Sequence, residues 1–168
     1  MKRLIAALAA LILLPAAALS QDAAPEMSET EQIARTYMDA YSRVDWDAVE
    51  ALMHEEIDFR DPTALGEGLG ADGLVHQGRE DTMEALREFG AAYNPLGLNF
   101  EWDVIFESNG RVVFMGHVNA TYPTDQEGQV FRWRAAQATV LELQDGQVIR
   151  HLDFADYAHA EQGLVAEE

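Results

Sequence analysis

Apolar positions recur along the chain with two periods, and the helical period comes first. Ser28 and Glu31 form a capping box, and the apolar spacing behind it predicts a helix that runs to about Arg43. Asp45 caps a second, shorter helix, and residues 79–93 predict a third. The apolar positions of the three helices are Ile33, Tyr37, Tyr41 and Val44; Trp46, Val49, Leu52 and Met53; and Met83, Leu86, Phe89 and Tyr93.

The strand period appears in residues 57–60, IDFR, and dominates after Pro95. Asn109-Gly110 and Asp145-Gly146 suit two-residue type I′ hairpins, and they divide the second half into four long antiparallel strands. Residues 61–78 contain five glycines and are predicted as a long loop, the kind that usually covers a site. This order of elements predicts an α+β fold in one domain.

The first hairpin assigns its side chains to two faces, because directly paired residues share a face. Counting outward from Asn109-Gly110 pairs Trp102 with His117 and Phe100 with Asn119. The face is heavily aromatic, so we expect it to look into the core. His117 and Asn119 are then polar groups that point inward among apolar neighbours.

The second hairpin is treated in the same way. Counting from Asp145-Gly146 makes the face of Trp133 and Gln137 the more apolar one, with Gln137 and Asp156 as its inward polar groups. His151 and Asp153 fall on the opposite face, where we expect a homodimer to form through the outer surface of the sheet. A β-bulge in either strand would reverse that assignment locally.

Residues 1–20, MKRLIAALAALILLPAAALS, combine a basic start, an apolar run and small residues before Gln21. This pattern is typical of a secretory signal peptide, with cleavage predicted after Ser20. The apolar run is shorter than the roughly 20 residues that span a bilayer, so we expect no membrane insertion after cleavage. The expected product, residues 21–168, is a periplasmic or secreted single domain with a polar lead and an acidic tail.

Composition then excludes several classes of function. The sequence has 11 Lys and Arg against 30 Asp and Glu, a net charge of −19, which argues against nucleic acid and anionic membranes as partners. The one lysine, Lys2, lies in the predicted signal peptide, so Schiff-base chemistry is excluded for the product. There is no cysteine, and no histidine pair has the spacing of a zinc helix. We expect neither a metal nor a cofactor.

The phrase VDWDAVEALMHEEIDFRDP, the helix GREDTMEALREF and the ending DGQVIRHLDFADY together resemble the NTF2-like superfamily. Within it, the chain is most similar to the SnoaL-like polyketide cyclase and ketosteroid isomerase branch. The resemblance covers nearly all of residues 28–159. It implies a cone in which N-terminal helices pack on a strongly curved antiparallel sheet and enclose an apolar pocket.

Ketosteroid isomerases carry a tyrosine donor on helix one and a basic aspartate just before a proline. Their pattern falls here on Tyr37 and on Asp61-Pro62. The third catalytic group of the ketosteroid isomerases is a buried carboxylic acid, which is a standard illustration of pKa tuning. The resemblance places the position of this acid near Ala138 or Thr139. Residues 131–141 contain no acid, so the resemblance supplies two of the three parts.

Each candidate residue also has a simpler interpretation. Asp61 before a proline is ordinary turn chemistry, Tyr37 suits an amphipathic core helix, and His117 could be a satisfied core histidine. The sequence predicts an exported domain that binds a small hydrophobic or carbonyl-bearing ligand, with isomerase or cyclase chemistry by Asp61 and Tyr37 if it is an enzyme. The alternative is a non-catalytic ligand-binding or dimerisation module. The predicted ligand-binding residues are His117, Asn119, Gln137, Asp156, Trp102 and Trp133.

Overall fold

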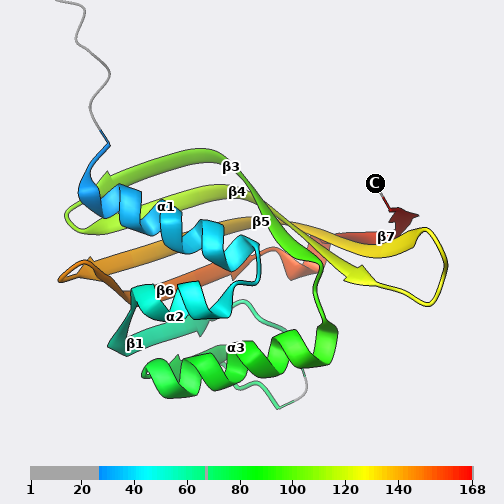
Figure 1. The fold of residues 1–168 in the computed structure, drawn as a ribbon, viewed down its shortest axis with the longest axis horizontal. Helices are drawn as coiled ribbons and strands as arrows, with labels where there is room; N and C mark the ends of the chain where they lie inside the picture. Colours follow the sequence, from blue (N-terminus) through cyan, green and yellow to red (C-terminus); the bar gives the residue numbers. More distant parts are fainter. Residues whose placement is uncertain (1–26, 67, 168) are drawn as a thin grey trace, which may run out of the picture.

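The computed structural model describes residues 27–66 and 68–167, so the predicted signal peptide lies outside the described residues. Within them, three α-helices form where the apolar spacing predicts them (Figure 1). The Ser28 hydroxyl accepts a hydrogen bond from Glu31 N–H at 3.0 Å, which confirms the predicted cap. The helices are α1 (Glu29–Ser42), α2 (Trp46–Leu52) and α3 (Arg79–Tyr93).

Seven strands of the described chain form one sheet in the order β2-β1-β6-β5-β4-β3, with β7 paired to β5. β1 and β6 run parallel, and the other pairs are antiparallel. The strands are β1 (Met53–Asp61), β2 (Leu74–Gln77), β3 (Gly97–Ser108), β4 (Arg111–Pro123), β5 (Gln129–Gln144), β6 (Gln147–Ala155) and β7 (Glu161–Ala166).

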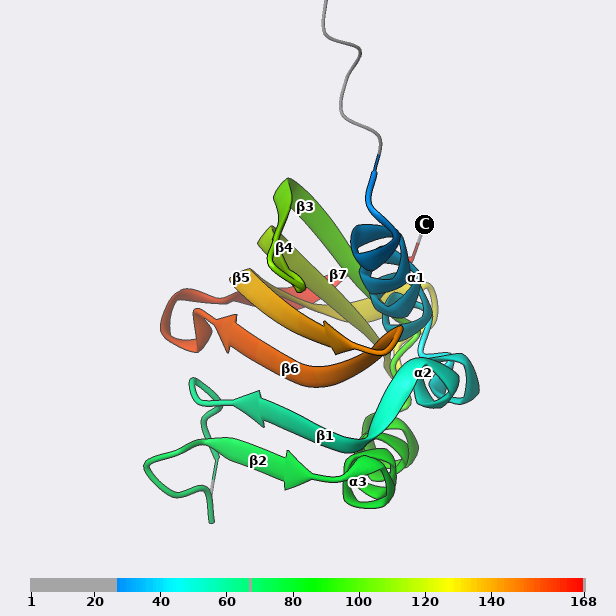
Figure 2. The ribbon, with the colours of Figure 1, turned by 90° about the vertical axis from the view of Figure 1, so that its left-hand side faces the viewer.

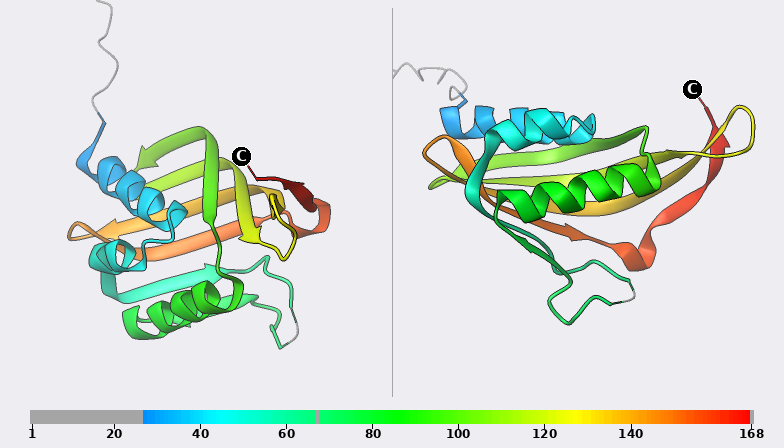
Figure 3. Two further views of the ribbon diagram at one scale, coloured as in Figure 1. Left: turned by 45° about the vertical axis from the view of Figure 1, so that its right-hand side comes forward. Right: turned by 60° about the horizontal axis from the view of Figure 1, so that its bottom comes forward.

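All three helices lie on one side of the curved sheet, as the turned views show (Figures 2 and 3). We call the covered side the inner face and the opposite side the outer face. The core lies between the helices and the inner face, and it includes the fully buried side chains of Tyr37, Val49, Ile57, Phe114 and Leu141. The predicted α+β cone, with N-terminal helices packed on a curved sheet, is confirmed.

Two short strands were not predicted. β2 lies inside the stretch predicted as one long loop, and β7 lies in the predicted acidic tail. Both are edge elements: β2 pairs with β1, and β7 pairs with the first half of β5. Their sequences, LVHQ and EQGLVA, are short and lack a clear strand alternation, so main-chain pairing with a longer neighbour supplies the order that their own pattern does not indicate.

Both predicted hairpin turns are confirmed. Asn109 and Gly110 have φ values of 52° and 77°, and Asp145 and Gly146 have values of 53° and 78°. A type I′ turn requires a positive φ at both central residues, which asparagine, aspartate and glycine tolerate best. The errors in the predicted faces therefore arise within the strands and not at the turns.

The first hairpin changes register at a β-bulge, where Asp103 is an extra residue of β3 between the pairs Trp102 with Gly116 and Val104 with Met115. β4 pairs with β5 without interruption, so its side chains alternate regularly, with Phe114 buried on the inner face. Trp102 therefore points inward, whereas Val104 and Met115 point outward.

The predicted inward orientation of His117 and Asn119 is wrong. Both lie in β4 opposite in phase to the buried residues Val118 and Ala120, so both point to the outer face. The reason is the bulge in β3, since it pairs His117 with Glu101 where an unbroken register would pair it with Trp102.

A second bulge, in β6, changes which side chains of the other hairpin point to the inner face. Ile149 is an extra residue of β6 between the pairs Leu143 with Val148 and Glu142 with Arg150. Beyond it, His151 and Asp153 point inward and are buried. An unbroken register would put both on the outer face, and the bulge reverses that assignment.

Asp156 is displaced by the same shift. It follows β6, is exposed, and caps the 3₁₀ turn Tyr157–His159 by accepting from His159 N–H at 3.2 Å. The predicted inward orientation of Asp156 is therefore wrong as well.

Candidate functional site

Five polar side chains gather on the inner face of β1, β5 and β6, inside an otherwise apolar core. β-strand alternation places Gln137 and Thr139 of β5 beside His151 and Asp153 of β6. Asp61 ends β1 on the same face, and all five residues are buried. A buried polar group is costly unless it is hydrogen-bonded, so the partners of each atom define what this site can do.

Tyr37 anchors the deep end of the cluster. Its hydroxyl lies 3.1 Å from His151 Nδ1, and the two rings meet edge to face. Burial raises the pKa of the Tyr37 phenol well above its usual value, and the nearby Asp153 adds to this shift. The phenol therefore keeps its proton. Among the described residues, the structure joins Tyr37 to His151 by a hydrogen bond and not to Asp61.

His151 and Asp153 continue the chain of polar groups toward the surface. His151 Nε2 lies 3.0 Å from Asp153 Oδ2, yet this buried nitrogen makes no well-directed hydrogen bond in the described part of the chain. The distance suits an ion pair, but the N–H direction misses the oxygen, so we treat the contact as close but unaligned. Asp153 Oδ1 accepts from Thr139 Oγ1 at 2.5 Å and from Gln137 Nε2 at 2.9 Å.

Asp61 is held by a separate set of donors. Its Oδ1 accepts from the backbone N–H of Thr63 at 2.9 Å and from the Thr63 hydroxyl at 2.6 Å, which is the local turn bonding expected of aspartate. Its Oδ2 accepts from the Tyr157 hydroxyl at 2.5 Å. Burial and this bond to Asp61 raise the pKa of Tyr157 far above its usual value, so Tyr157 remains a proton donor.

The two carboxylates are neighbours. Phe59 of β1 pairs with His151 of β6 in a parallel register, so continuing by two residues places Asp61 beside Asp153 on the inner face. Both charges contribute to the raised pKa values of Tyr41 and Tyr157, which agrees with this proximity. A pair of buried acids with hydroxyl donors is an arrangement suited to moving protons.

The aromatic candidates lie at different ends of the inner face. Trp133 packs on Tyr157, with ring centroids 5.5 Å apart, and so lines the end of the cone where Asp61 lies. Trp102 stacks on Phe100 at 4.9 Å, beneath α1, and lines a hollow of about 170 Å³ there. The structure thus brings Trp133, Gln137 and Asp61 together and leaves Trp102 apart from them.

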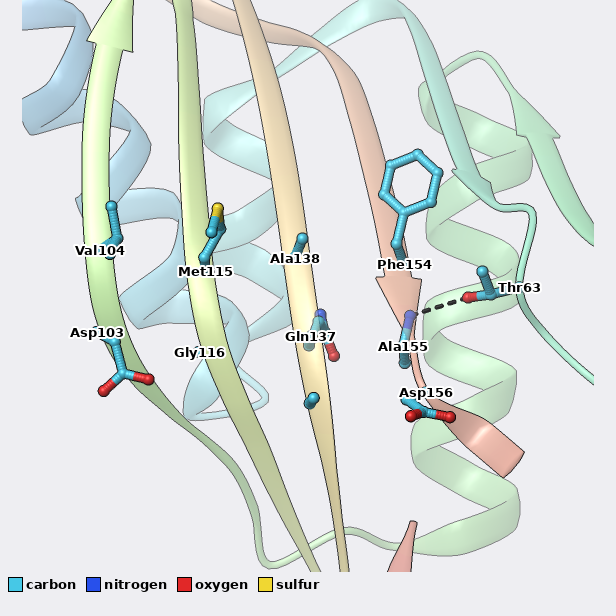
Figure 4. A pocket seen from close by; sticks show the side chains of 11 residues that line it. Thr63, Asp103, Val104, Met115, Gly116, Gln137, Ala138, Phe154, Ala155 and Asp156 are labelled. Atoms are coloured by element: carbon cyan, nitrogen blue, oxygen red, sulfur yellow. Dashed lines mark hydrogen bonds between the residues drawn. The ribbon is translucent and has the colours of Figure 1, made fainter. Parts of the chain in front are cut away.

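A different feature, a shallow hollow of about 530 Å³, lies on the outer face (Figure 4). Of the predicted site residues, Asp156 and Gln137 line it, whereas His117 and Asn119 do not. Its floor is made of small residues, Gly116, Ala136 and Ala138, and larger side chains such as Met115 and Phe154 flank it. Besides Asp103 and Asp156, its lining includes Thr63, and Gln137 of the polar cluster, but none of Tyr37, Asp61, His151 or Asp153.

Sequence reasoning missed four residues of the site: Thr63, His151, Asp153 and Tyr157. One signal pointed toward Asp153. The ketosteroid isomerase pattern requires an acid near Thr139, and in the structure the carboxylate of Asp153 lies 2.5 Å from the Thr139 hydroxyl. The acid comes from the neighbouring strand, where the bulge at Ile149 turns it inward.

Two further findings concern the described residues alone. No three histidine, aspartate or glutamate side chains among them come together as a metal-binding group. None of their helices has the length and apolar character needed to cross a membrane.

A family model for the SnoaL-like domain matches residues 34–151. Among solved structures, the chain is similar to a candidate SnoaL-like polyketide cyclase from Shewanella putrefaciens, with 22% identity over 79% of this chain and 93% of that one, at a TM-score of 0.64. It is also similar to a candidate ketosteroid isomerase from Kribbella flavida, with 21% identity over 78% and 80% of the two chains and a TM-score of 0.56. These likenesses show the fold. No curated protein matches the chain.

Proposed function

The chain belongs to the SnoaL-like domain family, and from this premise we propose that its cone binds a small hydrophobic, carbonyl-bearing molecule and that Asp61 moves a proton next to the carbonyl. The observation that carries the proposal is the pair of neighbouring carboxylates, Asp61 and Asp153, on the inner face beside Trp133 and Tyr157. The aromatic rings supply the apolar surface for the ligand, and the carboxylates supply the proton acceptor.

The proposed step uses Asp61 and Tyr157. A carboxylate oxygen of Asp61 takes the proton from a carbon next to the carbonyl, and the electrons of that bond move onto the carbonyl oxygen as an enolate. Once Asp61 carries the proton, the hydroxyl of Tyr157 is free to donate to the enolate oxygen. Asp61 then returns its proton to another carbon of the same ligand. No cofactor enters this step.

The role of Tyr37 changes in this proposal. The ketosteroid isomerase pattern implies that Tyr37 donates to the developing oxyanion, but its hydroxyl is fully buried and bonded to His151. We therefore assign Tyr37 to the positioning of His151. Gln137 and Trp133 keep their predicted places near the ligand.

An isomerisation assay tests the role of Asp61. We expect Asp61→Asn to slow the conversion of a β,γ-unsaturated cyclic ketone to its conjugated isomer by about 10²- to 10⁴-fold, measured by ultraviolet absorbance. Binding, followed by tryptophan fluorescence, should change by less than about threefold, because asparagine keeps the shape of aspartate. The matched control is Asp145→Asn, since asparagine also suits that distant hairpin turn. Turnover unchanged in Asp61→Asn would sink the proposal.

The alternative is a non-catalytic module, and one observation favours it. Asp61 already accepts three hydrogen bonds from Thr63 and Tyr157, as a purely structural turn residue would. In that case the parent protein turns over no ketone, and Asp61→Asn lowers the melting temperature instead.

We also propose that a second copy packs on the outer face. Val104, Phe106, Met115 and Phe154 are 40–47% exposed there, although they are large and apolar. Val104, Met115 and Phe154 flank a hollow with a floor of small residues. The same patch therefore has projecting apolar side chains and a recessed surface that could receive those of a second copy. A two-fold contact needs such a self-complementary patch, which makes a second copy the occupant that fits best.

A further inference from the structure

The hydroxyl of Thr63 joins Asp61 to the end of β6. Its hydrogen is donated to Asp61 Oδ1 at 2.6 Å, and its oxygen accepts a hydrogen bond from the backbone N–H of Ala155 at 2.9 Å. The direction of both bonds is fixed, because a carboxylate oxygen can only accept and a backbone N–H can only donate. Ala155, Thr63 and Asp61 therefore form a relay in which every hydrogen is assigned.

The side chain of Thr63 does more than close the turn after β1. The ordinary bond of an aspartate turn is the one from Thr63 N–H to Asp61 Oδ1, at 2.9 Å, and any residue other than proline at this position would supply it. The hydroxyl adds a second donor to the same oxygen. It also reaches Ala155, on a strand 92 residues further along the chain.

The two carboxylate oxygens of Asp61 consequently have different surroundings. Within the described residues, Oδ1 accepts both hydrogen bonds from Thr63, whereas Oδ2 accepts one, from the hydroxyl of Tyr157 at 2.5 Å. The ring of Tyr157 packs on Trp133, so Oδ2 is the oxygen on the side of the aromatic end of the cone. Oδ1 is occupied by Thr63, and Oδ2 is left to accept a proton from a ligand.

The backbone of Asp61 is held as closely as its side chain. Leu74 of β2 pairs with Asp61, and the residue before it, Gly73, has a φ of 66°. A Cβ added to Gly73 would lie 2.2 Å from the backbone oxygen of Asp61 and 2.8 Å from Cα of Pro62. Because the backbone is packed in this way, the freedom left to Asp61 is the rotation of its carboxylate, and the bonds from Thr63 restrict that rotation.

We propose that Thr63 is a positioning residue for Asp61: its hydroxyl holds Oδ1 and so makes Oδ2 the oxygen that takes the ligand proton. This rests on the proposed role of Asp61 and adds to it the residue that orients the base. In this arrangement Thr63 acts through Asp61 and not on the ligand. Hydrogen bonds to a carboxylate also favour its ionised form, so the same hydroxyl keeps Asp61 ready to accept a proton.

Two substitutions separate the hydroxyl from the size of the side chain. Thr63→Val keeps the shape and removes the hydroxyl, whereas Thr63→Ser keeps the hydroxyl and is the matched control. In the isomerisation assay, we expect Thr63→Val to lower kcat by about tenfold or more, with KM within about twofold, because a hydrogen bond to a charged group is lost. Thr63→Ser should recover kcat to within about threefold of the parent protein.

The pH dependence of kcat distinguishes positioning from a general loss of stability. Without the hydroxyl, the ionised form of Asp61 loses a donor, so the acid limb of the profile should move to higher pH by about one unit in Thr63→Val. Asp153, Tyr157 and Tyr41 are titratable groups close to Asp61, and they are the same in parent and variant, so the difference belongs to Thr63. An acid limb that stays in place would mean that Thr63 is a turn residue only.

A measurement on the parent protein depends neither on turnover nor on the folding of a variant. Asp61 is titrated and followed by the carbon-13 signal of its carboxyl group. The amide signals of Thr63 and Ala155 should move with the same midpoint, the first through its direct bond to Asp61 and the second through the hydroxyl. An Ala155 amide that ignores this titration would overturn the inference, as would full kcat in Thr63→Val. If the relay is present and the parent turns over no ketone, the proposed reaction fails while the positioning of Asp61 stands.

Discussion

The buried tyrosines make the stability of the molecule sensitive to alkaline pH. Burial raises the pKa values of Tyr37, Tyr41 and Tyr157, and it does so at Tyr122 as well. In the unfolded chain these phenols ionise near a pKa of about 10. Above that pH the folded state binds more protons than the unfolded state, so the free energy of unfolding falls as pH rises.

We therefore expect the protein to unfold cooperatively at alkaline pH, starting above a pH of about 10. Phenolate absorbance should rise together with the loss of the near-ultraviolet circular dichroism signal, since the buried phenols ionise only when the chain opens. Tyr37→Phe should make the decline in stability less steep. Ionisation of the buried tyrosines well before unfolding would contradict this account of the core.

At the scale of the elements, the two bulges decide which side chains meet. Asp103 in β3 shifts Gly116 opposite Trp102, and an added Cβ on Gly116 would lie 1.9 Å from the backbone oxygen of Glu101. No real Cβ makes such a contact, so glycine is required where the bulged strand comes close.

Gly116→Ala should therefore destabilise the fold, by about 1–3 kcal/mol as is typical of overpacking, in urea unfolding followed by circular dichroism. The matched control is Gly163→Ala in β7, where an added Cβ meets nothing within 4 Å. Reduced backbone freedom in the unfolded state should leave that variant neutral or stabilised by up to about 1 kcal/mol. Equal stability of both variants would mean that β3 can retreat from the contact.

The bulges also explain how much could be predicted from the sequence. Helix caps and two-residue turns depend on a few adjacent residues, such as Ser28 with Glu31, so the three helices, the five longer strands and their order were predicted correctly, whereas the short strands β2 and β7 were not. A bulge depends on the packing of whole strands, and nothing local marks Asp103 or Ile149 as an extra residue. One unpaired residue turns the rest of a strand over.

The bulges also explain which residues of the candidate site could be predicted and which could not. Asp61, Trp133 and Gln137 lie on the inner face, as the strand pattern or the resemblance indicated, and Tyr37 of α1 is buried against it, as the helix pattern indicated. Asp153 was placed on the outer face because the count from the hairpin turn crosses the bulge at Ile149. Its contact with Thr139 could be found only in three dimensions.

At the scale of the whole molecule, the charged side chains of the outer face lie apart from its apolar patch. The full sequence has a net charge of −19, yet the outer face holds its charges in a cross-strand row in which Arg111 and Arg150 both contact Glu142, and Arg150 also reaches Asp58. These pairs neutralise one end of the face and leave the apolar patch around Phe154 beside them. Because the remaining surface is acidic and repels other copies, association is expected only through this patch.

Phe154→Glu should therefore convert the proposed dimer to a monomer, because a carboxylate would be buried without a partner against the small-residue floor. Sedimentation analysis across a concentration series measures the change, and we expect the dissociation constant to rise by about tenfold or more. Leu65→Glu is the matched control, since Leu65 is equally apolar and 73% exposed but lies in the loop after β1. A parent protein that stays monomeric at every concentration, or a Phe154→Glu variant that stays dimeric, would show that the outer face has a different occupant.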